Sequence, residues 1–496
     1  MNLKLTKDER TGGCGNLKDS NESRKEQKTP ASHILGEQGG GYPEEVWLET
    51  RGIPEAQQAE TVSKNGNDDV QLLYTSNLLE LVLERGNMTR AYEQVVRNKG
   101  SHGIDNMKID QLKPYLKDNW EQIKRSQLEA GSYKPQPVRR VEIEKPDGGI
   151  RLLGIPTVLD RMIQQAIAQI LNGVFDHTFS QSSYGFRKGR SAHDAIHAAL
   201  DHKSEGYKYV VDMDLEKFFD RVNHDKLMSL IARKVGDKRL LKLIRSYLES
   251  GIMINGVEVI TEDGVPQGGP LSPLLSNIML DELDKELEKR GHRFVRYADD
   301  CNVYVKSERA GQRVYESIKR YLETRLKLKV NEDKSAVDKP ERRKFLGFSF
   351  YRKKDGEPRI RIHQRSFQRL KEKVRRVTSR KWGVSMEYRL KKLAEITNGW
   401  VNYFGIADGA SKLANLDGWI RRRLRSCIWK QWKRVKTRFK NLQKLGIPKD
   451  KAWEFANTRK GYWRISKSPI LTRTITNQRL EKRGFKSLVK RYQAVH

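Results

Sequence analysis

Two adjacent carboxylates interrupt an apolar stretch of the chain, in a setting that suits metal-ion chemistry. In FVRYADDCNVYV (294–305), one apolar run ends at Tyr297, Asp299 and Asp300 follow, and a second apolar run leads away. This pattern is typical of a β-hairpin with an Asp pair at its turn. Asp-Asp is also ordinary turn chemistry, so the pair alone would say little about function.

A third carboxylate favours the chemical interpretation. In KYVVDMDLEKFFD (208–220), a strand-like run ends at Asp214 and two aromatic residues follow. Two strands that each carry carboxylates at one end can place three oxygen ligands on the same edge of a sheet. Mg²⁺ prefers oxygen ligands and completes its octahedron with water and substrate phosphates. We therefore expect Asp214, Asp299 and Asp300 to form a magnesium site for phosphate chemistry.

The 496-residue chain has a net charge of +34, and the positive charge is concentrated toward the C-terminus. Residues 1–70 hold 9 Lys and Arg against 13 Asp and Glu, whereas residues 351–496 hold 41 against 10. A surface this basic favours binding of a polyanion. A lipid surface is a weaker candidate, because no basic amphipathic anchor or lipidation motif accompanies the charge.

Other features of the composition narrow the class of protein. The three cysteines, Cys14, Cys301 and Cys427, are far apart and indicate neither a disulfide framework nor a Cys-rich zinc site. No run approaches 18 apolar residues, and the N-terminus lacks the apolar segment of a signal peptide. We expect a cytoplasmic protein without a membrane partner.

The chain divides by pattern into segments of different character. Residues 1–70 are polar and Gly-rich, and we predict a disordered or loosely attached extension. Residues 71–350 mix helical and strand-like patterns. Within them, 141–156 read strand, turn, strand, with Lys145 and Arg151 beside the turn. These two cations could close over a triphosphate, or they could simply belong to a solvated hairpin.

Two further stretches suggest binding functions. A Gly-rich loop at 264–269 precedes a helical pattern, so its backbone could approach a nucleotide closely, with Gln267 as the polar contact. From about residue 361 the chain becomes a series of basic helical patterns. Trp419, Trp429 and Trp432 suit a core position, but Trp interleaved with Arg also suits a nucleic-acid groove.

The order of these motifs resembles bacterial group II intron-encoded proteins, which are reverse transcriptases and maturases. The resemblance spans roughly residues 75–496 and excludes residues 1–70. YADD alone is a weak signal, but the ordered series is specific: NKGSHGID, KPDGGIRLLGIP, SYGFRKGRSAHDAI, DMDLEKFFD, GVPQGGPLSP, YADD, LKVNEDKS, FLGFSFY, NGWVNYF and RRRLRSCIWKQWK.

The resemblance implies an α+β fold of the right-hand polymerase type. Fingers and a palm built on an antiparallel sheet would occupy residues 71–350, with the core motifs at about 124–350. An all-helical basic thumb or maturase domain would follow at 361–440, and a basic nucleic-acid-binding tail at 441–496.

The resemblance also implies the chemistry of the site. Two Mg²⁺ ions would serve the in-line transfer of a nucleotide from a dNTP to a primer 3′-hydroxyl, with Asp214 and Asp299 as main ligands and Asp300 as a secondary one. Asp212 and Asp220 lie close by, but the family pattern places an aromatic residue five positions after the metal ligand. Phe219 occupies that position and would exclude a ribonucleotide 2′-hydroxyl, unless it is a core aromatic.

The remaining site residues follow from the same mapping. Lys145 and Arg151 would hold the triphosphate, and Gln267 would contact the incoming nucleotide. Lys334 would protonate pyrophosphate, or it forms only a surface ion pair. The implied partners are group II intron RNA, an RNA template with its DNA primer, target DNA and dNTP, with a second copy of the chain as a further candidate. The nucleic-acid contacts are expected from Arg421, Arg422, Arg423, Arg425, Lys430, Lys433 and Arg434.

Two other functions compete with this interpretation. A maturase that assists splicing alone would not need three carboxylates held together, because like charges repel. A related reverse transcriptase of phage defence is disfavoured by the NGWVNYF segment. Many family members end in an HNH nuclease with cysteine pairs, which this sequence lacks, so we expect an endonuclease-lacking member that extends an existing 3′ end.

Overall fold

The computed structural model describes residues 76–144, 149–254, 257–259, 263–265 and 267–496. The chain separates into two units, residues 1–40 and 41–496, and the described residues all belong to the second. The extension expected at residues 1–70 therefore lies outside the described residues.

A helical layer opens the described part of the chain. Its central element is α5 (Val158–Phe175), which is buried on most sides because its sequence is apolar nearly all round. The side chain of Thr157 caps α5 by accepting from the Asp160 amide. Around α5 lie α2 (Leu78–Leu83), α3 (Arg85–Asn98), α4 (Ile109–Gln122) and a π-helical continuation of α4 (Ile123–Glu129).

The first sheet has the strand order β2-β1-β4-β5. Strands β1 (Val138–Glu144) and β2 (Ile150–Ile155) form the antiparallel hairpin that the sequence predicts, although its tip lies outside the described residues. Strand β4 (Ile252–Ile254) pairs with β1 in parallel, and β5 (Val257–Val259) pairs with β4.

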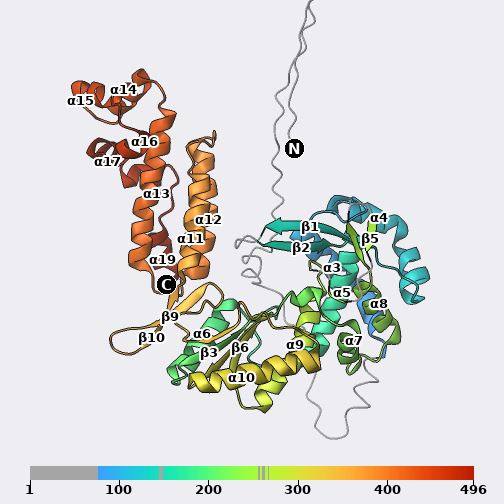
Figure 1. Ribbon diagram of the computed structural model, residues 1–496. Helices are drawn as coiled ribbons and strands as arrows, with labels where there is room; N and C mark the ends of the chain where they lie inside the picture. Colours follow the sequence, from blue (N-terminus) through green and yellow to red (C-terminus); the bar gives the residue numbers. More distant parts are fainter. Residues whose placement is uncertain (1–75, 145–148, 255–256, 260–262, 266) are drawn as a thin grey trace, which may run out of the picture. The chain divides into compact units, whose positions relative to one another are not determined.

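The second sheet carries two of the acidic motifs and has the order β6-β7-β3-β8. Every neighbouring pair in it is antiparallel. The sheet is backed by α6 (Ala192–Ser204), α9 (Ser272–Lys289) and α10 (Glu308–Tyr321) (Figure 1). Its strands are β3 (Tyr209–Met213), β6 (Arg293–Tyr297), β7 (Asp300–Val305) and β8 (Ala336–Asp338).

Between the Asp214 motif and the Gly-rich loop, the helical pattern forms two helices, α7 (His224–Ala232) and α8 (Lys238–Leu248). Asp237 lies between the two helices and starts α8, because its buried carboxylate accepts from the amides of Arg239 and Leu240. The same carboxylate accepts from the Leu79 amide of α2, so this cap also joins distant parts of the chain.

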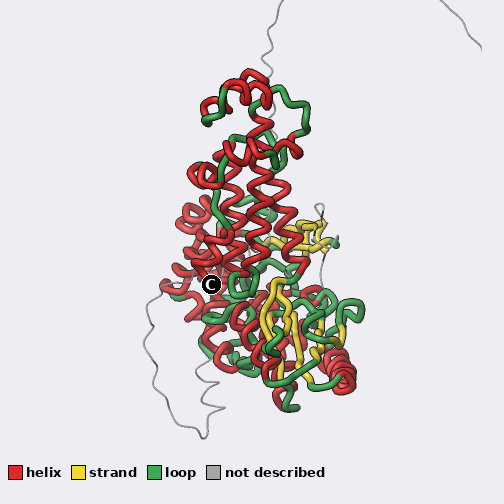
Figure 2. Tube along the Cα trace, turned by 90° about the vertical axis from the view of Figure 1, so that its left-hand side faces the viewer, coloured by secondary structure: helices red, strands yellow, loops and turns green. Residues whose placement is uncertain are grey.

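The C-terminal third is helical, as the sequence predicts (Figure 2). Its buried apolar residues form a core cluster of their own. Three long helices, α11 (Gln364–Val377), α12 (Met386–Phe404) and α13 (Ala410–Gln431), follow a hairpin of β9 (Phe348–Arg352) and β10 (Pro358–Ile362). Six shorter helices complete it: α14 (Val435–Lys444), α15 (Lys449–Ala456), α16 (Tyr462–Ile465), α17 (Pro469–Thr474), α18 (Asn477–Lys482) and α19 (Leu488–Val495).

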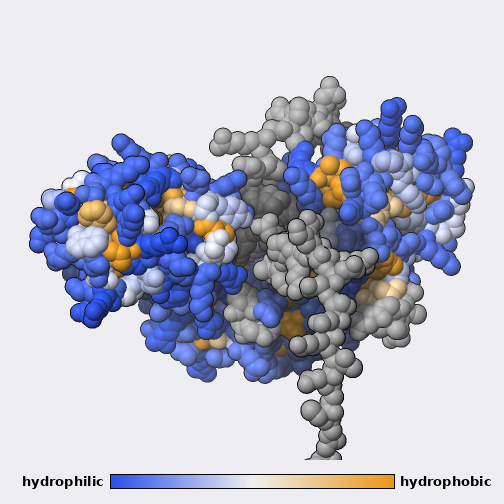
Figure 3. Space-filling view, turned by 90° about the horizontal axis from the view of Figure 1, so that it is seen from above, coloured by the Kyte–Doolittle hydropathy of each residue, from blue (hydrophilic) through white to orange (hydrophobic). Residues whose placement is uncertain are grey.

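A mixed sheet, an antiparallel sheet backed by helices and the basic helical region that follows confirm the predicted fold class. The visible described surface is mostly hydrophilic, with small and separate apolar patches (Figure 3). Among the described residues, no helix is both long and apolar enough to cross a bilayer.

The contact between α6 and the second sheet includes a histidine, His202, whose protonation should destabilise the folded protein. His202 lies against Tyr304, with ring centroids 5.3 Å apart, and against Tyr207. Burial lowers the pKa of His202, although Glu205 opposes the shift from 3.8 Å away. A lowered pKa means that the unfolded chain binds the proton more readily, so stability is lost as pH falls below about 6.5.

We expect His202→Phe to lose less thermal stability than the wild type between pH 7 and pH 5, because it keeps the aromatic packing without the titration. Melting curves by circular dichroism at the two pH values measure this difference. An equal loss in both proteins would show that other groups control the acid sensitivity.

Candidate active site

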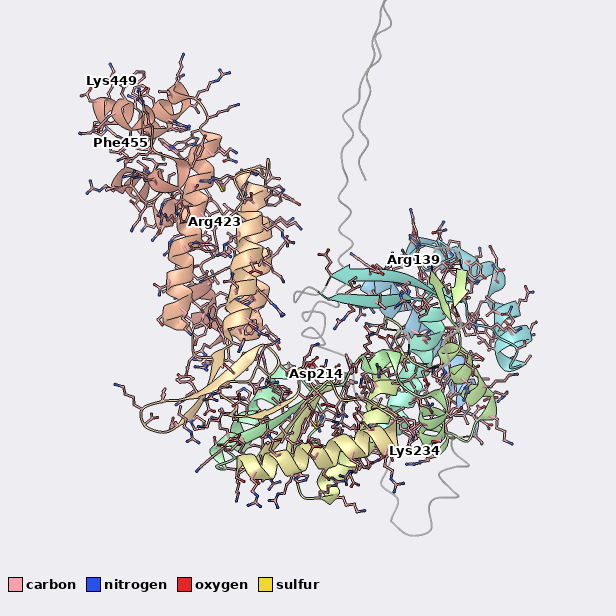
Figure 4. The ribbon with its side chains drawn as sticks, viewed as in Figure 1. Arg139, Asp214, Lys234, Arg423, Lys449 and Phe455 are labelled. Atoms are coloured by element: carbon pink, nitrogen blue, oxygen red, sulfur yellow. The ribbon has the colours of Figure 1, made fainter. Side chains whose placement is uncertain are left out.

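Strand pairing brings the two acidic motifs together. In the β3 and β7 pair, Met213 lies opposite Cys301, so the next position places Asp214 opposite Asp300. Directly opposed residues of an antiparallel pair have Cβ atoms about 5 Å apart. The Asp pair occurs where the sequence predicts it, at the turn between β6 and β7, and Asp214 is labelled in Figure 4.

The carboxylates around Asp300 help to raise its pKa. Desolvation by surrounding protein atoms and the negative charges of Asp299, Asp212 and Asp214 raise the pKa of Asp300 to about 7. Asp300 nevertheless keeps solvent-accessible surface, so a cation could reach it from water. The nearby positive charge of Lys344 opposes the shift.

These carboxylates provide the oxygen ligands that a divalent cation needs, but they do not form a complete set of protein ligands around it. Within the described ranges, no three His, Cys, Asp or Glu side chains are grouped closely enough to hold a metal ion by themselves. Mg²⁺ usually keeps several waters and is bound by one or two carboxylates together with substrate phosphates. The donor chemistry therefore fits a magnesium site that the substrate completes.

Asp212 has a different partner from its neighbours. Arg343 donates to its carboxylate, with Nη2 2.6 Å from Oδ2. Burial raises the pKa of Asp212, and the Arg343 charge opposes that shift. Asp220 is exposed one turn beyond the strand. Asp214 is the residue of this motif whose backbone position lies opposite the Asp pair.

A buried arginine holds the turn that carries the Asp pair. Arg296, in β6, is completely buried and forms an ion pair with the equally buried Asp284 of α9. Its Nη1 also donates to the carbonyl of Ala298 at 2.9 Å and to Asn277 Oδ1 at 3.0 Å. Its Nη2 donates to Ser183 Oγ at 2.8 Å. One guanidinium therefore joins the turn that carries the Asp pair, α9 and the loop before α6.

That loop is packed directly against the turn. Asn277 donates to the Gly185 carbonyl at 2.9 Å, and the Tyr184 amide donates to the Arg296 carbonyl. A Cβ atom on Gly185 would lie 2.2 Å from the Ala298 nitrogen, so only glycine permits this approach. Ala298 itself has a φ of 56°, a conformation uncommon for residues with a side chain.

The Gly-rich loop connects two other predicted site residues. The Gln267 carbonyl accepts from the Gly154 amide of β2 at 2.7 Å, and the Val265 amide donates to the Phe219 carbonyl at 2.6 Å. Gly268 adopts a φ of 130°, and a Cβ atom there would lie 2.4 Å from the Gly154 carbonyl oxygen. The backbone around Gln267 is therefore fixed between β2 and the short 3-10 helix Phe218–Asp220.

The other candidates for nucleotide contact occupy different positions. Arg151 is exposed on β2, and Lys145 lies outside the described residues. Phe219 is half-buried against Phe218, with ring centroids 5.2 Å apart. Lys334 is exposed in a turn whose neighbour, Ser335, accepts from the Asp214 amide at 3.0 Å. The structure thus connects the Lys334 turn to the Asp214 strand.

Several cations predicted to bind nucleic acid are bonded to other groups of the protein, among them Arg423, which is labelled on α13 in Figure 4. Arg425 is buried and donates to the Ile475 carbonyl at 2.9 Å and to Asn477 Oδ1 at 3.0 Å. Its expected direct contact with nucleic acid is therefore corrected to a structural position.

Four of the other six cations also contact groups within the protein. Arg421 lies 3.9 Å from Asp417, Arg422 stacks on Trp463, Arg423 donates to Thr378, and Lys430 donates to the Arg380 carbonyl. Lys433 and Arg434 are exposed, and their side chains have no bonded partner within the part of the chain that the structure describes.

Arg296 and Asp284 were not among the site residues predicted from the sequence. The signal was present, because an arginine in the middle of the apolar run FVRY is costly unless its charge is paired. What the sequence could not show is which carboxylate pairs with it, since α9 approaches β6 only in the folded protein.

We expect Arg296→Met to lower the stability by about 3–5 kcal/mol, because it leaves the Asp284 charge buried and unpaired. The double variant Arg296→Met with Asp284→Leu should recover most of that stability, as apolar replacements of buried ion pairs do. It should still catalyse poorly, because nothing donates to the Ala298 carbonyl. Chemical denaturation and nucleotide incorporation measure the two effects. Full activity in the double variant would contradict a positioning role for Arg296.

Comparison with protein families assigns both parts of the described chain. Residues 143–350 match the family described as reverse transcriptase (RNA-dependent DNA polymerase). Residues 367–446 match the group II intron, maturase-specific domain.

Similar proteins extend this assignment. Protein YkfC of Escherichia coli (strain K12) is 32% identical over 305 residues, which are 53% of this chain and 80% of YkfC. The group II intron-encoded protein LtrA of Lactococcus lactis subsp. cremoris is 29% identical over 365 residues, which are 60% of each chain. A solved chain from a partial Cas6-RT-Cas1--Cas2 complex is 28% identical, but its TM-score of 0.33, over 50% of this chain and 42% of that one, is too low to support an argument about the fold.

The two family matches and the similarity to YkfC and LtrA agree with the geometry of the carboxylates and the basic helical region. The chain belongs to the group II intron reverse transcriptase and maturase family and is an RNA-directed DNA polymerase with a maturase domain.

Proposed function

We propose that Asp214, Asp299 and Asp300 bind two Mg²⁺ ions and catalyse nucleotide transfer from a dNTP to a primer 3′-hydroxyl on an RNA template. The observation that carries this proposal is the β3 and β7 register, which places Asp214 opposite Asp300 and beside the Asp pair. When bound, the cations would polarise phosphate oxygens and neutralise developing charge. The protein's own contribution is to hold the carboxylates in place through Arg296.

Around these carboxylates, we propose that backbone contacts orient the nucleotide-binding residues. Gln267 would contact the incoming nucleotide and Phe219 its sugar, because the Gly-rich loop bonds both to β2 and to the Phe219 carbonyl. Arg151 and Lys145 would bind the triphosphate from the β1 and β2 hairpin, with Lys334 acting on the departing pyrophosphate. Arg suits phosphate through its planar fork, and Lys as a point charge.

We propose that the helices from α11 onward bind intron RNA and the template-primer duplex, and that residues 441–496 add contacts to target DNA. The protein would perform these functions in the cytoplasm, where such nucleic acids are found. Binding would be mainly electrostatic and shape-directed, since A-form RNA offers phosphates and 2′-hydroxyls more readily than base edges. Of the predicted cations, Lys433 and Arg434 are the most available.

Asp299→Asn should lower template-directed primer extension by about 10³-fold or more, because metal ions contribute several kcal/mol to such reactions. Binding of intron RNA should be unchanged, since the substitution lies in the palm. Extension of a DNA primer on an RNA template, with Mg²⁺ and dNTP, measures the first effect, and a filter-binding assay measures the second.

Asp118→Asn is the matched control, because Asp118 is an exposed carboxylate on α4. It should extend primers like the wild type. If Asp299→Asn extended primers normally, the two-metal proposal would fail. If the wild type promoted splicing without any extension, a maturase acting only in splicing would be the better account.

The double variant Lys433→Gln with Arg434→Gln should bind intron RNA more weakly and with a smaller salt dependence. Each lost phosphate contact should lower the slope of log affinity against log salt by about 1. Titrations at several salt concentrations measure both quantities. Lys238→Gln with Lys242→Gln removes the same charge from exposed positions on α8, and it should change the slope less.

A further inference from the structure

The C-terminal helices contain a pocket with an aromatic wall and a cationic rim. It has a volume of about 220 Å³. Its wall is formed by the end of α13, the turn after α14 and the segment from α17 to α18. The lining residues are Trp432, Leu445, Thr474, Ile475, Arg479, Lys482 and Arg483.

The charges of this pocket select an anion. Three of its seven lining residues are cationic and none is acidic. The nearest acidic residue in sequence, Glu481, accepts from Lys490 Nζ at 2.7 Å instead. Within the described part of the chain, neither Lys482 nor Arg483 has an ion-pair partner. Three like charges around one cavity repel one another, and a bound phosphate would relieve that repulsion.

The aromatic wall adds a second requirement on the ligand. Trp432 lies at the end of α13, is half-buried, and its ring centroid is 5.8 Å from that of the buried Trp429. Arg438 stacks on Trp429, and in the described chain no cation is stacked on Trp432. A half-buried indole beside phosphate-binding cations suits a nucleobase, since base stacking on aromatic residues contributes about 1–3 kcal/mol per base.

The pocket is held in shape by bonds that do not involve the ligand. The buried Arg425 donates to the Ile475 carbonyl, and Arg479 donates to the carbonyls of Thr474 at 2.6 Å and Leu445 at 3.3 Å. These bonds join α13, the turn after α14 and the start of α18. The site therefore exists before a ligand binds.

The volume restricts the ligand further. Sites for small metabolites and drugs occupy about 300–1,000 Å³, which is more than this pocket offers. A duplex cannot enter such a pocket, because its bases are paired and stacked inside. One extruded base, with its own phosphate on the rim, matches both the volume and the chemistry.

We propose that this pocket binds one unpaired nucleotide of a nucleic-acid strand, with the base against Trp432 and the phosphate at Lys482 and Arg483. The inference rests on the proposed nucleic-acid binding by the C-terminal helices and adds a preference for bulged or single-stranded positions. Thr474 to Arg483 lie beyond the residues 367–446 that match the maturase-specific domain. The sugar, ribose or deoxyribose, is distinguished by the test.

The test uses the full-length protein in EDTA without dNTP, so that polymerase activity plays no part. The probes are a DNA duplex and an RNA duplex, each with a single bulged 2-aminopurine, and the same duplexes fully paired. The wild type should bind the bulged probe about tenfold more tightly and change the 2-aminopurine fluorescence by stacking. The nucleic acid with the larger preference identifies the sugar.

Two substitutions separate stacking from packing at Trp432. Trp432→Leu keeps apolar contact with the helical core but cannot stack, so the preference for the bulge should disappear. Trp432→Phe should keep most of it. If Trp432→Leu bound the bulged probe as tightly as the wild type, with the same fluorescence change, the pocket would not hold a base.

Charge variants test the rim. Lys482→Gln with Arg483→Gln should reduce the preference for the bulged probe. Lys436→Gln with Lys440→Gln, two exposed positions on α14, should weaken the bulged and paired probes equally. Equal weakening of both probes by the rim variant would overturn the proposal. Because Asp299→Asn should keep the bulge preference, failure of the pocket and failure of the polymerase site give different results.

Discussion

The turn that carries Asp299 and Asp300 depends on a buried ion pair. Arg296 and Asp284 have no solvent-exposed side-chain surface, and the same guanidinium donates to the Ala298 carbonyl, Asn277 and Ser183. Burying two charges is expensive, and here the cost is offset by a full set of hydrogen bonds. Because these bonds connect three segments, the turn that carries Asp299 and Asp300 keeps one position relative to α9 and to the loop before α6.

The same rigid frame holds charges that oppose one another. Asp214 faces Asp300 across β3 and β7, and the pKa of Asp300 rises to about 7 because desolvation and, after it, the neighbouring carboxylates disfavour its ionised form. Arg296 holds the turn through its bonds to Asp284 and to the Ala298 carbonyl, so the turn keeps its position despite the repulsion between Asp214, Asp299 and Asp300. A cation bound beside these carboxylates would relieve their repulsion.

The basic C-terminal region uses its cations in two ways. Some are structural: Arg425 joins α13 to the segment before α18, and Arg423 joins it to the end of α11. Others, such as Lys433, Lys482 and Arg483, extend into solvent. Net charge therefore overstates the number of phosphate contacts, because a guanidinium that is bonded to carbonyl groups inside the protein has fewer donors left for a ligand.

The sequence alone determined the order of the motifs, the hairpin with its Asp pair and the basic helical region, because these depend on local patterns and on charge. The fold class followed from the family resemblance that the ordered motifs carry. The sequence also marked Gly268 and Gln267 as a loop of interest. Only the tertiary structure decided which residues meet: Arg296 with Asp284, Gly185 with Ala298, and Arg425 with Ile475. The start of α8 likewise depends on the buried Asp237 cap, which also bonds to the distant Leu79 amide. Long-range pairing and burial arise from packing between distant segments, and one sequence without its fold carries no direct record of them.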